Sequence, residues 1–302
     1  LEGHSNLVCC LAFSPDRARI VLGSWDSKVC VWDATTGVVV AGPLEGHSPG
    51  SSVNCVTFSH DSKHIASGSS DKTVHMWDAQ TGKASAIIIE GHTQDVKCLA
   101  FSPDSAWIVS GSWDDTVRVW DVRAGKPAAG PFKSHGNLVA DVKFSPDGVC
   151  IVSGHLDNMI HVWDAVTGEH VVGPFEGHTA GISFVSFSPN GAQIVSAGPD
   201  GTIRVWDAGT REVATPFEGH GGWVLSVALS PNGEQIVSSS ADSTIRVWNS
   251  RTGEVLATFQ GHSDRVTSVE FSPDGTRIVS GSEDTTISSM RYRNQWTAAI
   301  LL

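Results

Sequence analysis

Histidine, serine and aspartate recur in this sequence at spacings that could support hydrolytic chemistry. Serine follows a histidine by 18 residues and aspartate follows it by 22, as in His92, Ser110 and Asp114. A serine that is polarised by histidine and aspartate can act as a nucleophile. Residues 46–50 also match the G-x-S-x-G pattern that surrounds the nucleophile of many hydrolases.

The repetition of the set argues against catalysis. An enzyme needs a catalytic triad once, whereas this set occurs about six times. The nucleophile pattern requires a strand-to-helix turn, and residues 46–50 lie in a loop of a sequence without a sustained helical period. We therefore predict that the protein is not an enzyme and has no catalytic residue, metal or cofactor.

The set belongs to a repeat of about 43 residues. Gly-His opens six repeats and Ser-His opens one, and the histidines of successive openings lie 42 to 45 residues apart. Tryptophan follows the histidine by 28 residues in five copies and by 30 in the second, while the seventh copy has Met290 instead. The repeats run approximately over 3–45, 46–90, 91–133, 134–176, 177–218, 219–260 and 261–302.

Short alternating runs between turn signals fill each repeat, which is typical of β-strands. In the fifth repeat we expect strands at 182–188, 193–197, 202–207 and 211–217. One four-stranded sheet cannot bury both of its faces, whereas seven sheets stacked radially can. We predict an all-β fold in which residues 1–302 form a single seven-bladed β-propeller of four-stranded antiparallel blades.

This pattern resembles the WD-repeat β-propeller family over essentially the whole chain. The motifs that carry the resemblance are Gly-His at the start of each repeat and Trp-Asp near its end, with Asn249 once in place of the aspartate. The phrasing also resembles the repeat arrays of large fungal and bacterial STAND-type signalling proteins, in which the propeller often acts as a sensor. Because the sequence begins within the pattern and lacks an initiator methionine, we expect it to be part of a larger multidomain chain.

In the family, the repeated polar residues form a buried hydrogen-bond relay, and the resemblance implies a relay here. Indole N–H donates to serine, serine to histidine, and histidine to aspartate, which suits the capacity of each group. The first repeat contributes His4, Asp26 and Trp32, with Leu22 in the serine position. The others contribute His47, Ser67, Asp71 and Trp77; His92, Ser110, Asp114 and Trp120; His135, Ser153, Asp157 and Trp163; His178, Ser196, Asp200 and Trp206; His220, Ser238, Asp242 and Trp248; and His262, Ser280 and Asp284.

Six histidines lie outside this relay. His75 and His161 occupy a strand position that arginine fills in three other repeats, which indicates a solvent-accessible surface row. His60 and His64 flank a hairpin turn, and no further ligand converges on them in the sequence. We therefore expect no metal site at these histidines.

Positions that differ between repeats are expected to carry the specific function. In the family, ligands usually meet the top face, which the Gly-His loop and the turn before the tryptophan strand build. The resemblance places there the third and fifth residues after the histidine and the residue before the turn aspartate. The predicted partner-binding residues are Leu7, Trp25, Asn54, Asp95, Lys97, Trp113, Leu138, Leu156, Trp223 and Arg265.

Three of the five tryptophans outside the repeat position fall in this set: Trp25, Trp113 and Trp223. Aromatic patches often mark interaction sites. We predict a non-catalytic protein-protein interaction scaffold or sensor module that binds a peptide or protein at the top face, around the central channel. The alternative is small-molecule or glycan binding through the same tryptophans, with Asp95, Lys97 and Asn54 as polar partners.

Composition argues against other partners. The 302 residues include 20 Lys and Arg against 32 Asp and Glu, a formal net charge of −12, whereas nucleic acids and anionic membranes attract basic clusters. No run of 18 apolar residues could span a membrane, and no signal peptide is expected. The six cysteines suit small apolar positions of a cytoplasmic protein, and adjacent Cys9 and Cys10 should point to opposite faces of a strand.

The seventh repeat departs most from the pattern, since it lacks the tryptophan and residues 288–294 have lost the repeat phrasing. Only two residues precede the first Gly-His, too few to supply the outer strand of the last blade. We expect residues 296–301 to supply that strand, and the seventh blade to be the weakest.

Overall fold

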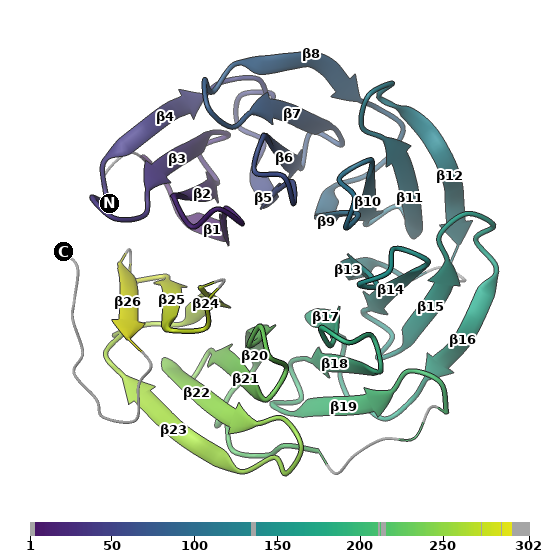
Figure 1. The fold of residues 1–302 in the computed structure, drawn as a ribbon, viewed down its shortest axis with the longest axis vertical. Coiled ribbons are helices and arrows are strands. Elements are labelled where there is room, and N and C mark those ends of the chain that lie inside the picture. Colours follow the sequence, from purple (N-terminus) through teal and green to yellow (C-terminus); the bar gives the residue numbers. More distant parts are fainter. Residues whose placement is uncertain are drawn as a thin grey trace.

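The computed structural model is a seven-bladed β-propeller around a central channel (Figure 1). It describes residues 4–133, 137–210, 212, 216–272, 274–284 and 286–291. These residues form strands and loops without a helix, and so none of them belongs to a helix that could cross a membrane. The predicted all-β, antiparallel, seven-bladed propeller is confirmed.

Each blade is an antiparallel meander whose first strand lies at the channel and whose last strand lies at the rim (Figure 1). Blade one comprises β1 (Val8–Phe13), β2 (Arg19–Ser24), β3 (Val29–Asp33) and β4 (Val39–Leu44). Blade two comprises β5 (Val53–Phe58), β6 (His64–Ser69), β7 (Val74–Asp78) and β8 (Ala84–Ile89). Blade three comprises β9 (Val96–Phe101), β10 (Trp107–Ser112), β11 (Thr116–Asp121) and β12 (Lys126–Lys133). Blade four comprises β13 (Val139–Phe144), β14 (Cys150–His155), β15 (Ile160–Asp164) and β16 (His170–Phe175).

The remaining blades follow the same order. Blade five has β17 (Phe184–Phe187), β18 (Gln193–Ala197) and β19 (Ile203–Asp207), and Phe217 forms an isolated bridge to Ile203 at the rim. Blade six has β20 (Val224–Leu229), β21 (Gln235–Ser240), β22 (Thr244–Asn249) and β23 (Val255–Gln260). Blade seven has β24 (Val266–Phe271), β25 (Arg277–Ser282) and β26 (Ile287–Arg291). The predicted closing strand at 296–301 lies outside the described residues.

The core lies between blades, because each thin sheet buries its two faces against its neighbours. The six repeat tryptophans are at most 2 % exposed. Trp77 of blade two, for example, packs with Val21 and Val29 of blade one. Valine and isoleucine fill the middle strands, where β-branched side chains fit a pleated surface that is covered on both sides.

His75 and His161 are buried, at 6 % and 5 % exposure, which contradicts the predicted solvent-accessible row. The His75 ring stacks on Trp77 with ring centroids 5.8 Å apart. The Gly-His loop of blade two covers the rings of His75 and Trp77. A Cβ on Gly46 would lie 2.9 Å from Nδ1 of His75. Glycine therefore leaves room for the loop to close over a position that the strand alternation alone would leave open.

A β-bulge interrupts the inner strand of six blades. In β1, Val8 pairs with Ser24 and Cys10 with Gly23, so Cys9 is the extra residue. The inner strands of blades two, three, four, six and seven show the same register shift. A bulge breaks the alternation of side chains between the two faces. Cys9 and Cys10 consequently both line the channel, which corrects the prediction that they point to opposite faces.

Candidate functional site

The repeated polar residues form hydrogen-bonded chains inside the blades. In blade three, the Trp120 indole N–H donates to Ser110 Oγ at 2.7 Å. Ser110 Oγ lies 2.7 Å from His92 Nε2, and His92 Nδ1 lies 2.9 Å from Asp114. Chains with every link between 2.7 and 3.0 Å join His47, Ser67, Asp71 and Trp77 in blade two; His178, Ser196, Asp200 and Trp206 in blade five; and His220, Ser238, Asp242 and Trp248 in blade six.

Burial and hydrogen bonds in these chains shift the pKa of several of their members. Burial alone would raise the pKa of Asp71, but hydrogen bonds from His47, Thr73 and Ser48 outweigh it and hold the pKa well below its ordinary value. Burial lowers the pKa of His220, against the opposing effect of Asp242. A neutral histidine can donate from Nδ1 to the carboxylate and accept at Nε2 from serine. The acid and base groups are thus engaged within their own blade.

Blade one lacks the serine that joins its two ends. His4 Nδ1 lies 3.0 Å from Asp26, and the backbone N–H of Ser5 donates to the same carboxylate. Leu22 stands where the other blades have serine and offers no polar atom. Within the described residues, His4 Nε2 and Trp32 Nε1 are consequently buried without a hydrogen-bond partner.

Blade four uses a histidine that sequence reasoning missed. His135 lies outside the described residues. His155 Nε2 lies 2.8 Å from Ser153 Oγ, which accepts from the Trp163 indole at 2.7 Å, while Asp157 accepts from the Asn137 amide at 2.9 Å. The available signal was that His155 stands two residues after the relay serine, where five other repeats have serine.

Blade seven keeps the histidine end of the relay. His262 lies 2.9 Å from both Asp284 and Ser280. Met290 pairs with Ile278 across the sheet and packs on the adjacent core, but its thioether has no N–H to donate.

His47, Asp71 and His75 form the one group among the described residues in which three potential metal ligands lie within 4.8 Å of one another. Both ring nitrogens of His47 already make relay hydrogen bonds. Asp71 accepts from Ser48 and Thr73 as well. The ligand atoms of this group therefore serve the blade, and a metal ion would have to displace these bonds.

Backbone hydrogen bonds bring the predicted top-face residues together in pairs. The N–H of Trp25 donates to the carbonyl of Leu7, and that of Trp113 to Asp95, at 2.9 and 3.0 Å. The same bond joins Ser70 to Ser52, Leu156 to Leu138, Ala241 to Trp223 and Glu283 to Arg265. Each pair ties the Gly-His loop to the turn before the tryptophan strand, so one section of the channel mouth comes from each of six blades.

Three large aromatic side chains are exposed at this mouth. Trp25, Trp113 and Trp223 are 51 %, 41 % and 52 % exposed. Lys97 Nζ lies 4.4 Å from the ring centroid of Trp113, and the guanidinium carbon of Arg265 lies 5.9 Å from that of Trp223. The negative face of an indole attracts a cation at these distances. Aromatic surface and positive charge therefore lie together at two places, one within blade three and one between blades six and seven.

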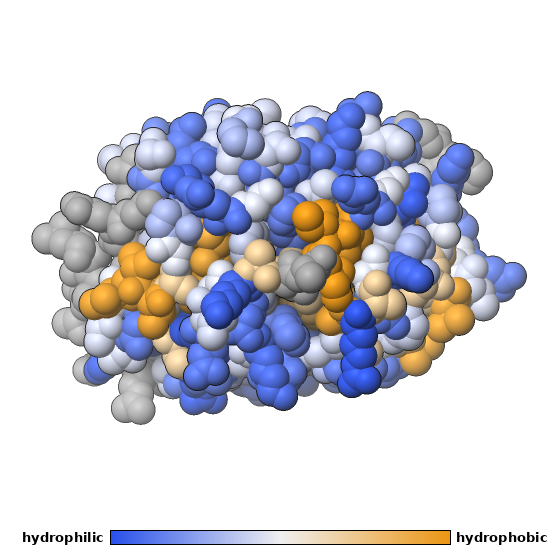
Figure 2. All heavy atoms as spheres, turned by 90° about the horizontal axis from the view of Figure 1, so that it is seen from above, coloured by the Kyte–Doolittle hydropathy of each residue, from blue (hydrophilic) through white to orange (hydrophobic). Residues whose placement is uncertain are grey.

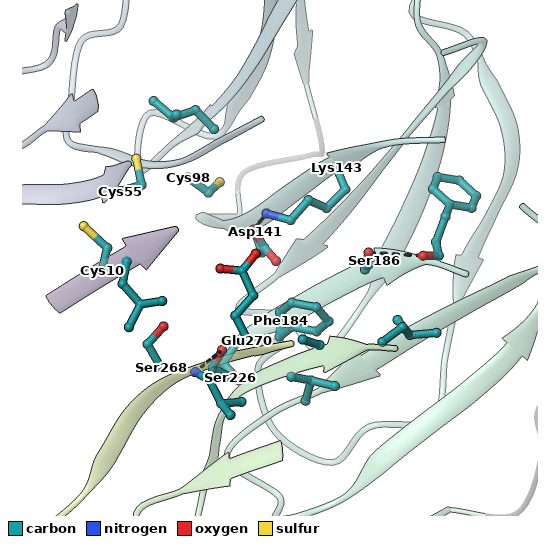
Figure 3. A pocket seen from close by; sticks show the side chains of 18 of the residues that line it. Cys10, Cys55, Cys98, Asp141, Lys143, Phe184, Ser186, Ser226, Ser268 and Glu270 are labelled. Atoms are coloured by element: carbon teal, nitrogen blue, oxygen red, sulfur yellow. Dashed lines mark hydrogen bonds and ion pairs between the residues drawn. The ribbon is translucent and has the colours of Figure 1, made fainter. Parts of the chain in front are cut away.

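The central channel encloses about 590 Å³ and is lined by the inner strands (Figure 3). One ring of its wall takes one residue from each blade: Cys10, Cys55, Cys98, Asp141, Phe184, Ser226 and Ser268. Lys143 pairs with Asp141 at 3.3 Å. Glu270 of β24 accepts from the backbone N–H of Phe13 in β1 at 3.0 Å, a bond that joins the last blade to the first. Burial raises the pKa of Glu270 to about 7.

Two family models match this chain. The model described as "IFT122 first beta-propeller" matches residues 7–183. The model described as "WD domain, G-beta repeat" matches residues 169–207, 211–249 and 253–288. The chain belongs to the WD-repeat β-propeller family. Among curated proteins, no sequence matches this chain.

WD-repeat propellers typically mediate protein–protein interactions and are generally non-enzymatic scaffolds. The groups of this propeller that could act as acids or bases in the repeat are engaged in relays, as in His92 and Asp114. The nucleophile-like Ser48 lies in the loop between β4 and β5, where its N–H donates to Asp71. Three of the large aromatic residues outside the repeat pattern, Trp25, Trp113 and Trp223, are instead exposed.

The bulge determines which residues reach the mouth of this WD-repeat propeller. Side chains at the bulge bond across to the next blade, as Asn54 Nδ2 donates to the carbonyl of Val96 at 3.0 Å. Ser183 in blade five, where the pairing of β17 with β18 shows no register shift, donates to the carbonyl of Val224 at 2.6 Å. Sequence reasoning placed Asn54 and Lys97 on the top face, but could not anticipate these bonds because they depend on register.

Proposed function

We propose that this propeller is a non-catalytic interaction module that binds a peptide or protein segment at the top face, around the channel mouth. The observation that carries the proposal is the exposure of Trp25, Trp113 and Trp223 on three different blades. A tryptophan buries a large area at low conformational cost when a partner covers it. The side of the rim that is in view in Figure 2 is mostly hydrophilic and carries separated apolar patches.

The positive charges at the mouth indicate which kind of peptide segment would bind there. Lys97 Nζ donates to the side-chain oxygen Oδ1 of Asn54 at 3.3 Å, and the Arg265 guanidinium lies over the Trp223 ring. Within the described part of the chain, neither cation makes an ion pair. A carboxylate of the partner could pair with either cation while an apolar side chain covers the indole. We therefore propose a segment that carries aspartate or glutamate beside an apolar residue.

Glycan or small-molecule binding is the second candidate, and a polar chain beside Trp113 favours it. The Asn54 amide donates to Ser70 Oγ at 3.1 Å, and Ser70 Oγ donates to Asp95 at 2.7 Å. Sugar hydroxyls need such partners beside the aromatic ring on which the sugar stacks.

A peptide-display selection on the wild-type propeller, followed by affinity measurement, tests the first proposal. Trp113→Ala and Trp223→Ala should each weaken a selected acidic-apolar peptide by about tenfold or more, which corresponds to about 1.4 kcal/mol. Trp107→Ala is the matched control, because Trp107 is 38 % exposed at the end of β10 opposite the mouth. Equal affinity in all three variants would overturn the proposal.

A glycan array separates the two candidates. Binding of a glycan by the wild type that Trp113→Ala abolishes, together with failure to select any peptide, would replace the peptide proposal by the glycan one.

A further inference from the structure

Four of the six cysteines line the central channel, and the proposed peptide site does not require them. They are Cys9, Cys10, Cys55 and Cys98. Cys10, Cys55 and Cys98 hold the same position on the inner strands of three successive blades and appear on one side of the channel in Figure 3. All six cysteines are free thiols.

The bulge in β1 places two sequence-adjacent thiols against one backbone oxygen. Cys9 Sγ donates to the carbonyl of Val53 at 2.8 Å, and Cys10 Sγ lies 3.7 Å from the same oxygen. These two distances limit the separation of the sulfur atoms to 6.5 Å. A regular strand would have directed them to opposite faces.

The thiolate is the form that binds metals, so both thiols must give up a proton when an ion binds between them.

We propose that Cys9 and Cys10 form a binding site for a soft, thiophilic monovalent ion of the Cu(I) class. Two thiolates suit Cu(I), which accepts two-coordinate sulfur ligation and is selected by soft ligands. Structural zinc takes four protein ligands, and the described residues offer no third His, Cys, Asp or Glu ligand within 4.8 Å of both thiols. Binding forms two sulfur–copper bonds and releases the two thiol protons to solvent, without electron transfer.

The chain itself supplies conservative replacements for both cysteines. Ser183 stands at the Cys9 position in blade five and makes the equivalent bond to Val224 at 2.6 Å. Ser226 and Ser268 stand at the Cys10 position in blades six and seven. Cys9→Ser and Cys10→Ser therefore reproduce arrangements that this fold already contains, and both variants should fold.

Anaerobic titration of the full chain with Cu(I), in competition with a chromogenic Cu(I) chelator, tests the site. We expect one tightly bound ion in the wild type, and about a hundredfold weaker binding in Cys9→Ser and in Cys10→Ser, because each removes one of two thiolates. Cys150→Ser is the matched control, since Cys150 is half-buried and lies outside the channel. Unchanged binding in Cys9→Ser, or an equal loss in Cys150→Ser, would overturn the proposal.

Labelling by a trivalent arsenical that requires two close thiols gives an independent readout. Wild type and Cys150→Ser should react, whereas Cys9→Ser and Cys10→Ser should not. Thermal melting of each variant verifies that the propeller is folded. Reaction of folded Cys9→Ser at the wild-type level would contradict the pairing of these two thiols. Neither readout depends on a peptide partner, so the two proposals can fail separately.

Discussion

A hydrogen bond in the relay should stabilise the fold only where both of its partners exist. Trp120 donates to Ser110, whereas Trp32 faces Leu22 and its indole N–H is buried without a partner among the described residues. Both indoles are about 1 % exposed, and Trp120 in addition lies under the Arg118 guanidinium, which is 5.9 Å from its ring centroid. Blade one is therefore an internal control for the relay in blade three.

We predict that Trp120→Phe lowers the free energy of unfolding by about 1–2 kcal/mol more than Trp32→Phe does, because only the former breaks a buried hydrogen bond. Urea denaturation of the two variants measures the difference. Equal losses would show that the relay adds nothing to the packing of the ring.

Glu270 should make the junction between β1 and β24 sensitive to pH. The pKa of this carboxyl is ordinarily 4.5 and is raised to about 7 by burial, against the hydrogen bond from Phe13 and the charge of Lys143. The folded state thus binds the proton more strongly than the unfolded chain does. The stability contributed by the protonated form is complete below about pH 4.5 and is lost as the pH rises through about 7.

Glu270→Gln should therefore be more stable than the wild type at pH 8, by roughly 2–3 kcal/mol, and similar to it near pH 4. Glutamine can still accept the N–H of Phe13, so the hydrogen bond at the junction is kept. The measurement is the difference in unfolding free energy between the two proteins across this pH range. A difference that does not change with pH would contradict the assigned ionisation.

At the scale of elements, blade seven lacks the tryptophan end of its relay. His262 and Ser280 are in place, but Met290 cannot donate to the serine. Met290→Trp should raise the midpoint of thermal unfolding by a few degrees, equivalent to about 1 kcal/mol, by supplying the missing N–H. Met290→Phe adds an aromatic ring without the donor, and an equal gain in that variant would attribute the effect to packing.

At the scale of the whole molecule, the blades could be predicted from the sequence, because the same pattern of strands and turns recurs in each repeat. The predicted strand at 193–197 coincides with β18, and the predicted strand at 182–188 contains β17. The register of the strands and the burial of side chains between blades could not be predicted in the same way. The bulge that brings Cys9 beside Cys10, the burial of His75 and the use of His155 in blade four all depend on contacts between strands. The likeness to STAND-type proteins stays a prediction.

For the top-face residues, too, contacts between strands could not be predicted from the sequence. The resemblance to the family implied their location, and backbone bonds such as that from Trp113 to Asp95 join the predicted residues in pairs. The position of a cation over each of two indoles could not be predicted from the sequence. Lys97 reaches Trp113 from a different strand, and the direction of its side chain depends on the bulge. The pairing of charge with aromatic surface is what narrows the proposed partner.

The location of a bound partner tests the central claim most directly. A display-selected peptide that carries a photoreactive group can be crosslinked to the full chain, and the attachment sites can be mapped by mass spectrometry. We expect crosslinks to the loops that carry Trp25, Trp113 and Trp223, and their loss in the presence of excess unlabelled peptide. Crosslinks confined to the rim strands, or to the turns at the opposite end of the channel, would contradict the assignment of the binding site to the top face.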